Sequence, residues 1–288
     1  MISKELLLTI ANYIANGAVS VQSSTTLSTT KFVPYQIIAI MKNNEVTVSR
    51  TTVTSISVRD AINASQEETL TIRFSATDAS PMTYKTDKIE LWASTQTALL
   101  YKIADITLNT PLTKSEHDYL NIEYEIIVTA GANYTTVNAM SQYTTVVTFR
   151  SIVAPILYFF GLFLVPNWEE VLKQNPTFPQ SQLVNLINVK QFQGVNAMYV
   201  GSINANIVSK LVGFGKGEVN LVINGQISTP VTNAPVFIGI QTGVGVIVLA
   251  YNYFSGTVSK YVSLEIPMSY GASTVVKQYE TETTGERT

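Results

Sequence analysis

The sequence has no cysteine and only one histidine among its 288 residues. The absence of cysteine excludes disulfide bonds, thiolate catalysis and thiolate metal sites. Charged residues make up 13% of the chain, whereas a typical soluble domain has about 25%. The net charge is −2 and no basic cluster occurs, so the electrostatic footprint of a nucleic-acid-binding protein is missing. We therefore expect no nucleic acid among the partners.

Long hydrophobic runs are scarce as well. One apolar stretch, Ile152 to Val165, has no charged residue, but it is shorter than the roughly 20 residues that a membrane-spanning helix needs. Pro155 lies near its start, and Gly161 is suited to a bend. We expect a buried pair of strands or a crossing between two sheets here, and no membrane span.

The N-terminus does not have the pattern of a signal peptide, because Glu5 follows Lys4 and the apolar stretch is short. The residues instead predict a short helix. Ser3 is suited to cap its first turn, and Gly17 is suited to end it.

The place of the missing charges is taken by Thr, Ser, Asn, Val and Tyr, which favour β-strands. Apolar residues alternate with polar ones over many segments, and short strands at intervals of about 8–12 residues are typical of sandwiches and barrels. The fold class predicted is all-β, with two tandem antiparallel β-sandwiches of jelly-roll type. Residues 1–150 form the first, with the N-terminal helix, and residues 151–275 form the second, with a helical insertion at about 166–194. Residues 276–288 are expected to form a polar tail that is mobile or that orders against a neighbour.

A similar succession of elements occurs twice along the chain. In each half an alternating strand is followed by a Ser/Thr-Pro-apolar-Thr motif, with Pro81 in the first copy and Pro230 in the second. Proline fixes φ and interrupts strand pairing, so both prolines are predicted to form corners. We interpret the pattern as an internal duplication, in which Pro34 would also match Pro155. Chance similarity between two β-domains of biased composition is the alternative.

No set of residues has the pattern of a catalytic, cofactor-binding or metal site. The single histidine, His117, lies between Glu116 and Asp118 in a polar segment that predicts an exposed loop. Glu123 and Glu125 share one face of a predicted strand. These carboxylates could be half of a glycosidase pair or a cation site, but we interpret them as the solvent face of that strand. We therefore expect neither an enzyme nor a cofactor.

Two other motifs have a structural interpretation. The glycine-rich segment from Gly213 to Gly217 opens a strand rather than a helix, so it predicts a β-turn and not a phosphate-binding loop. Asn63 and Asn133 begin Asn-x-Ser/Thr triplets in predicted loops, which makes them candidate glycosylation sites.

The segment "TDKIELWASTQTALLYKIADITLNTPLTKSEHDYLNIEYEIIVTAGANYTTV" resembles the N-terminal domains of phage tail-collar fibre proteins, over roughly Leu70 to Val137. The tandem β-architecture, low charge and lack of cysteine are similar to virion structural proteins of archaeal icosahedral viruses, such as the turret and capsid proteins of Sulfolobus turreted viruses. Both resemblances imply a component of a virus particle, and neither transfers a functional residue.

The mean hydropathy of +0.20 and the low charge favour a chain that hides surface in an assembly. The sequence therefore predicts a virion structural protein, such as a capsid, turret or spike subunit, made in the host cytoplasm and located in the virion. Its partners would be further copies of itself and other virion subunits. The alternative is an adhesin or tail-fibre module that binds a host surface glycan or receptor.

Overall fold

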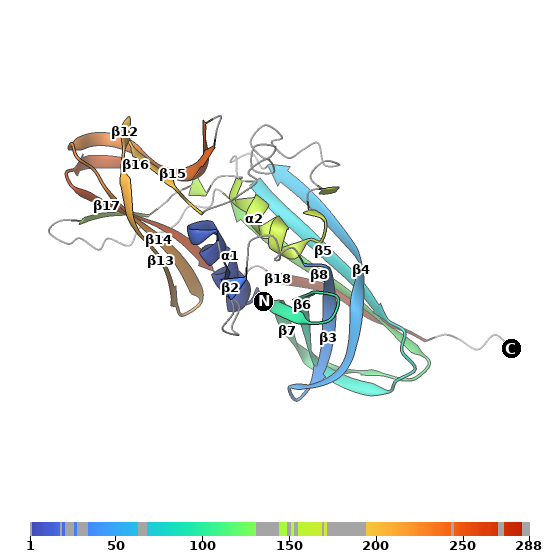
Figure 1. The fold of residues 1–288 in the computed structure, drawn as a ribbon. Helices are drawn as coiled ribbons and strands as arrows, with labels where there is room; N and C mark the ends of the chain where they lie inside the picture. The colour runs from blue at the N-terminus through green and yellow to red at the C-terminus, as the bar shows by residue number, and fades with distance from the viewer. Residues whose placement is uncertain are drawn as a thin grey trace.

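The structure is a computed structural model, and it describes residues 2–17, 19–20, 26–27, 34–62, 68–130, 144–148, 151–152, 155–168, 170–171, 194–242, 245–269 and 274–283. Most of these residues lie in β-strands that form curled, predominantly antiparallel sheets (Figure 1). The all-β expectation is confirmed at this level.

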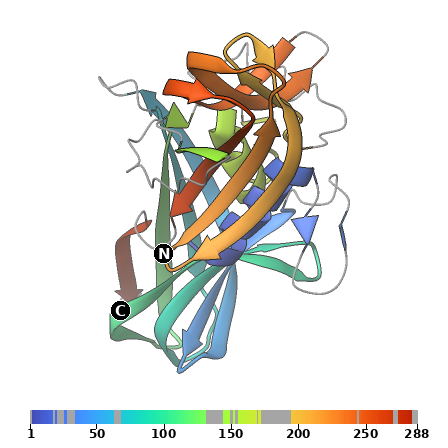
Figure 2. The same cartoon turned by 90° about the vertical axis from the view of Figure 1, so that its left-hand side faces the viewer.

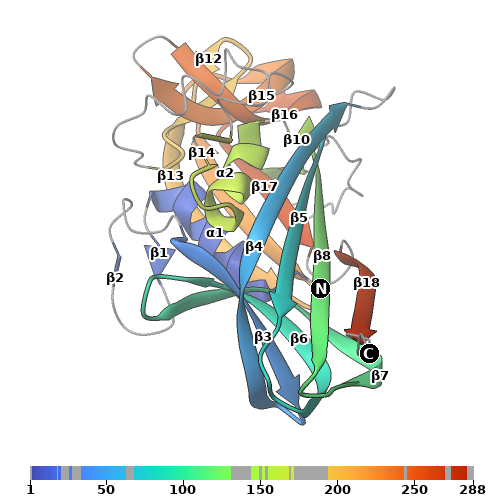
Figure 3. The ribbon, with the colours of Figure 1, turned by 90° about the vertical axis from the view of Figure 1, so that its right-hand side faces the viewer.

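The first half of the chain contains one helix and nine strands in its described residues. They are α1 (Lys4–Asn16), β1 (Val19–Ser20), β2 (Thr26–Leu27), β3 (Gln36–Asn43), β4 (Val46–Ile62), β5 (Glu68–Asp78), β6 (Tyr84–Ser94), β7 (Leu99–Lys114), β8 (Asp118–Ala130) and β9 (Thr144–Thr148). Strands β3 to β8 belong to a sheet of order β18-β8-β5-β4-β3-β6-β7, and Figure 3 shows β4, β5, β8 and β18 running side by side.

The second half forms two further sheets and a second helix. Its elements are β10 (Ser151–Ile152), α2 (Pro155–Leu164), β11 (Ala197–Val200), β12 (Ile203–Asn204), β13 (Asn206–Gly215), β14 (Glu218–Gln226), β15 (Val231–Thr242), β16 (Gly245–Val258), β17 (Tyr261–Ser269) and β18 (Thr274–Thr283). The sheet orders are β10-β16-β15-β11-β12 and β13-β14-β17-β9.

The two halves pair their strands in the same way. In the first half β6 pairs with β7 and β5 pairs with β8, and in the second half β15 pairs with β16 and β14 pairs with β17. The next neighbours also correspond. In the first half β4 lies beside β5 and β3 lies beside β6, and in the second half β13 lies beside β14 and β11 lies beside β15. Strand β12, which directly precedes β13 in the chain, pairs with β11 as β4 pairs with β3. This common order supports the internal duplication. The proposed match of Pro34 with Pro155 is wrong, because Pro34 precedes β3 whereas Pro155 is the first residue of α2.

The last strand of each half pairs with the sheet of the other half. Strand β9 follows the first set of strands but pairs in parallel with β17, and β18 follows β17 but pairs antiparallel with β8. Residues 274–283 therefore form a strand of their own chain rather than a free polar tail. Chain segments cross between the halves in both directions, which distinguishes this fold from two domains that are joined only end to end.

The two helices lie between the sheets of the two halves (Figure 1). Helix α1 packs against β7 and β14, while α2 packs against α1, β8 and β16. Two hydrogen bonds fix α1 to both halves: the Ser3 N–H donates to the Ile103 carbonyl at 2.9 Å, and the Val195 N–H donates to the Ile14 carbonyl at 2.8 Å. The buried apolar residues of both halves form one cluster around these helices.

Helix α1 begins and ends where its capping residues predict. The Ser3 side chain accepts a hydrogen bond from the Leu6 N–H at 3.0 Å, which satisfies one of the free donors of the first turn. Gly17 adopts a φ of 65° and its N–H donates to the Tyr13 carbonyl at 2.8 Å. Glycine takes this left-handed conformation without the steric cost that a side chain would add.

The expectation of strands between Ile152 and Val165 is wrong, because most of this stretch forms helix α2. Pro155 is compatible with the first turn of a helix, where its missing N–H has no intrahelical partner. The apolar residues that follow are compatible with a buried strand or a buried helix, and contact with Trp168 and the neighbouring sheets selects the helix. Gly161 marks a close contact and not a bend, since the Trp168 indole lies directly against it.

The expected helical insertion is described only in part. Trp168, Glu170 and Val171 are helical, and Trp168 is fully buried. The second expected helical stretch, residues 181–189, lies outside the described residues.

Candidate functional site

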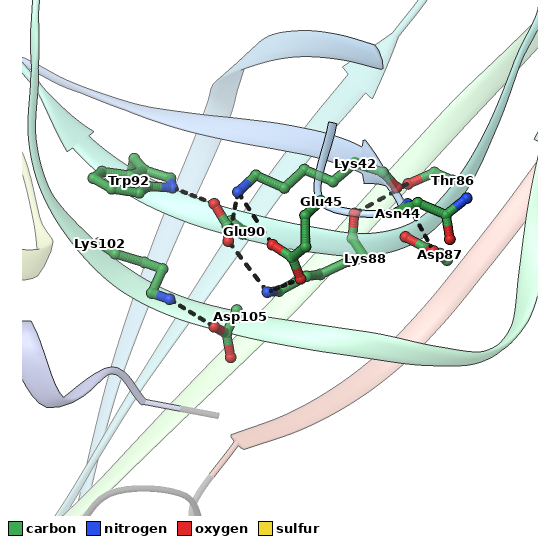
Figure 4. A network of polar contacts seen from close by, with 10 residues as sticks. All are labelled: Lys42, Asn44, Glu45, Thr86, Asp87, Lys88, Glu90, Trp92, Lys102 and Asp105. Carbon is green, nitrogen blue, oxygen red and sulfur yellow. Dashed lines mark hydrogen bonds and ion pairs between the residues drawn. The ribbon is translucent and has the colours of Figure 1, made fainter. Parts of the chain in front are cut away.

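A cluster of alternating charges covers the outer face of β3, β6 and β7 (Figure 4). We call this the charged cluster; its members are Lys42, Glu45, Lys88, Glu90, Lys102 and Asp105. In the strand register Lys42 lies opposite Lys88, and Glu90 lies opposite Asp105. Like charges directly opposite each other are unfavourable. The two lysines, however, lie next to the two carboxylates, so the favourable contacts between opposite charges run diagonally from strand to strand.

Glu90 is the centre of the charged cluster and is only 2% exposed. Its carboxylate lies 3.1 Å from the Lys42 ammonium and 3.6 Å from the Lys88 ammonium, and it accepts a hydrogen bond from the Trp92 indole at 2.8 Å. A buried carboxylate is tolerated only when it is paired and hydrogen-bonded. This group was not among the residues predicted from the sequence, although the i, i+2 spacing of Lys88, Glu90 and Trp92 on one strand face is a usable signal.

The pKa shifts of Glu45, Lys88 and Lys102 favour the ionised forms of these three side chains. The hydrogen bond from Lys88 lowers the pKa of Glu45, and the same bond raises the pKa of Lys88. Burial lowers the pKa of Lys102, but the hydrogen bond and the charge of Asp105 outweigh this effect and raise it overall. Such paired groups hold three strands together and are poorly suited to donate or accept a proton in a reaction.

A buried lysine fixes the loop that contains Pro81. The Lys114 ammonium donates hydrogen bonds to the carbonyl oxygens of Ser80, Met82 and Ser115, the last two at 3.3 Å, and its side chain is only 1% exposed. Pro81 itself is exposed between β5 and β6, at the point where the chain leaves one strand for a strand that is not its neighbour.

A buried aspartate lies beside this loop. The Asp78 carboxylate accepts hydrogen bonds from Ser49 and Tyr84, both at 2.6 Å, and from the Ser80 N–H at 2.9 Å. Burial favours a higher pKa for Asp78, but these hydrogen bonds outweigh it and lower the pKa below the ordinary value.

Pro230, the counterpart of Pro81, is exposed between β14 and β15 and carries the chain from one sheet to the other.

The expectation that Glu125 faces solvent is wrong. Its side chain is buried, and the Arg73 guanidinium lies 3.0 Å from it on the neighbouring strand. Strand β8 is an inner strand of its sheet, with β5 on one edge and β18 on the other, and Arg73 on β5 lies directly opposite Glu125. Glu123 is half-buried, and the two carboxylates do not form an exposed pair.

The remaining predicted residues show no reactive arrangement. His117 is exposed in the turn between β7 and β8, as expected, and its ring lies 3.2 Å from the Glu116 carboxylate. Asn63 and Asn133 lie outside the described residues. Within the described part of the chain, no group of three or more His, Asp or Glu residues could hold a metal ion.

The turn between β13 and β14 is the one that its glycines predict. Lys216 and Gly217 connect β13 to β14, and Gly217 adopts a φ of 83°. Thr242 pairs with Gly245 across the hairpin of β15 and β16, while the two residues between them are not described.

Exposed apolar side chains concentrate on β13, which is an edge strand of its sheet. Val208, Leu211 and Phe214 are 53%, 56% and 65% exposed. The gold strand β13 forms the outer margin of this sheet in Figure 2. Edge strands with unpaired backbone groups and apolar side chains are ready sites for pairing with another chain. We call this strand the apolar edge.

The other exposed aromatic side chains are dispersed. Tyr35 precedes β3, Tyr119 lies in β8 and Tyr253 lies in β16. Their positions on three separate elements provide no evident aromatic platform for a sugar ring.

No family model and no solved structure matches the chain. The chain is 70% identical over 287 residues to the "Putative transmembrane protein ORF289" of Acidianus filamentous virus 2, an alignment that covers 100% of this chain and 99% of that protein. It is also 29% identical over 119 residues to the "Uncharacterized protein 53" of Sulfolobus islandicus filamentous virus, which covers 37% of this chain and 36% of that protein. Within the described residues, the structure contains no helix with the length and apolar character needed to cross a membrane.

Both relatives come from filamentous viruses. The resemblance to archaeal virus proteins therefore holds, but for filamentous viruses and not for the icosahedral turreted viruses that the sequence suggested. The chain belongs to a family of archaeal filamentous virus proteins that includes the ORF289 protein of Acidianus filamentous virus 2.

Proposed function

We propose that the protein is a structural subunit of the virion, made in the host cytoplasm and incorporated into the particle through contacts with further copies of itself and with other virion subunits. The observation that carries this proposal is the apolar edge. A viral protein that exposes three large apolar side chains on the edge strand of a sheet has a surface suited to assembly.

The charge distribution supports a role in assembly over a role in catalysis. The members of the charged cluster are paired with one another, and Glu125 is paired with Arg73. Such pairs stabilise strand order but provide no unpaired acid, base or nucleophile. We therefore propose no enzymatic activity.

The position in the particle is also part of the proposal. A capsid or spike subunit is compatible with a filamentous virus, whereas a turret belongs to the vertices of an icosahedral shell. The tandem sandwich arrangement suggested by the sequence stays a prediction within this proposal, and it would give the subunit a rigid β-surface in each half.

Quantitative mass spectrometry of purified particles tests the proposal, together with immunogold labelling of the same particles. We expect the protein in a fixed ratio to the other virion proteins after washing with detergent and salt. Recovery of the protein in host membranes, with none in the particles, would overturn the proposal. The alternative, an adhesin that binds a host glycan or receptor, predicts binding on a glycan array or to host cells.

A further inference from the structure

The outer edge of β8 is a strand-binding site, and its occupant comes from the far end of the chain. Strand β18 pairs antiparallel with β8 from Ile126 to Asp118, and Figure 3 shows it beside β8 at the margin of the sheet. Every residue of β18 except Lys277 has a partner in this ladder. Backbone pairing of this kind is a general mode by which an extended segment binds to the edge of a sheet.

Strand β18 depends on this ladder for its place in the fold. Within the described residues, β8 is the one element with which β18 makes extensive contact. The preceding strand in the chain is β17, which belongs to a sheet of the second half. A last strand that packs against nothing but its acceptor can be donated to another acceptor of the same kind without the loss of other packing.

Exchange between two copies preserves the pairing of the closed chain. On the β8 edge of a second copy, β18 would form the same ladder as on its own β8. The balance between the two arrangements therefore depends on concentration, because a strand of the same chain acts at an effective concentration of about millimolar. Crowding of subunits in an assembly shifts this balance towards the β8 edge of a neighbour.

The fold already joins its two halves by strand donation. The first half gives β9 to β17, and the second half gives β18 to β8. Because the halves share one order of strands, this arrangement has the form of a domain swap between two similar units. The same operation between chains would link one copy to the next.

We propose that copies of the chain associate head to tail by donation of β18 from one copy to the β8 edge of the next. This inference deepens the proposed function and rests on it. The contact is heterologous, because the donated strand and the acceptor edge are different surfaces, and it therefore leaves a free acceptor at one end and a free donor at the other. The resulting open chain of subunits suits a filamentous particle, and both relatives come from filamentous viruses.

The absence of cysteine from the chain allows a direct test of the exchange. Tyr119 lies opposite Glu282 in the ladder and is 40% exposed. We expect full-length Y119C and full-length E282C to form a disulfide with each other when they are refolded together at high concentration and mildly oxidised. Each variant alone should give no disulfide-linked dimer.

Two matched variants control this result. Y119C mixed with T274C should not cross-link, because Thr274 pairs with Ile126, about 24 Å along β8 from Tyr119. The double variant Y119C/E282C, oxidised in dilute solution, should form its disulfide within one chain. If the double variant closes within one chain but the mixture of single variants stays unlinked, β18 remains on its own β8 and the inference is wrong. If the double variant does not close, the β8 ladder itself is wrong and the inference fails with it.

Sedimentation velocity of the wild-type chain at rising concentration measures the form of the assembly. We expect a series of oligomers of increasing length, since each added copy presents a new β8 edge. A chain that stays monomeric at all concentrations, or that stops at a dimer, would contradict the head-to-tail arrangement.

These results are separable from those on the proposed function. Presence of the protein in purified particles supports the virion role whatever the cysteine variants show. If the protein is in the particles and Y119C does not cross-link to E282C, the strand exchange is wrong and the virion role stands. If the protein is absent from particles, the virion role fails even when the exchange occurs.

Discussion

Replacement of Gly161 by alanine tests the packing of the two central helices. A β-carbon on Gly161 would overlap three atoms of the Trp168 indole, and Cδ2 would be 2.6 Å away. Carbon atoms in favourable contact are about 3.5–4.0 Å apart, so the ring must move by about 1 Å or more. Trp168 is only 1% exposed, and little space is available for this movement.

Two opposing effects decide the magnitude. Alanine favours a helix over glycine by about 1 kcal/mol. Overpacking of a filled core costs about 1–3 kcal/mol, and expulsion of a large aromatic ring costs about 3–5 kcal/mol. Because a rigid ring and not the end of a flexible side chain must move, we expect the steric cost to exceed the gain. The net loss of unfolding free energy should be about 2 kcal/mol, which lowers the Tm by about 4 °C or more.

The assay is urea unfolding of the full-length chain, followed by circular dichroism. The double variant with Trp168→Leu provides the critical comparison, because removal of the indole removes the overlap. In that background Gly161→Ala should be neutral or stabilising, so the coupling energy between the two sites should be at least about 1.5 kcal/mol. Gly213→Ala is the control, since a β-carbon there meets no atom within 4 Å. If Gly161→Ala is as stable as the wild type, or costs the same in both backgrounds, the packing argument is wrong.

Three further predictions concern buried polar groups. Arg73→Met should reduce the unfolding free energy by about 2 kcal/mol, because it removes the guanidinium that pairs with the buried Glu125. The loss is no larger because Arg73 itself is partly exposed. In urea titrations, Glu125→Gln added to Arg73→Met should recover part of the lost stability. Lys114→Met should reduce the unfolding free energy by about 2–3 kcal/mol, because three carbonyl oxygens lose a charged donor. A loss below about 0.5 kcal/mol in the same titrations would contradict the role of Lys114 in fixing the loop that contains Pro81. The pKa of Asp78 is lowered in the folded state, so its contribution is present above the ordinary value of 3.8 and is lost as the pH falls through the folded-state pKa. The stability difference between wild type and Asp78→Asn should therefore shrink below pH 3.8, and a constant difference across the pH range would refute this.

An internal duplication would give the exchanged strands a common explanation. Each half contains a helix followed by strands of the same order. Each half also contributes its last strand to the other half, β9 to β17 and β18 to β8. The halves are therefore connected by two strands, two helices and a shared apolar cluster, and we expect them to unfold together rather than as independent domains.

Several features of this protein follow from the sequence alone. The caps at Ser3 and Gly17, the turn at Gly217 and the alternation of strands such as β5 and β14 all depend on neighbours within a few residues. The repeated order of strands was also visible, because each strand and each corner proline has a local pattern. Local patterns of this kind depend on backbone geometry and on which side of an element is apolar, and the sequence displays both.

Other features were decided only by the tertiary structure. The apolar run before Val165 is compatible with a buried strand or a buried helix, and contact with Trp168 and the neighbouring sheets selects the helix α2. Glu125 is buried and paired with Arg73 because β5 and β8, about 50 residues apart in the chain, become neighbours in the sheet. The charged cluster forms because β3, β6 and β7 become neighbours. Periodicity shows which face of a strand is polar, but the partner that covers that face comes from distant parts of the chain, and only the folded structure brings them together.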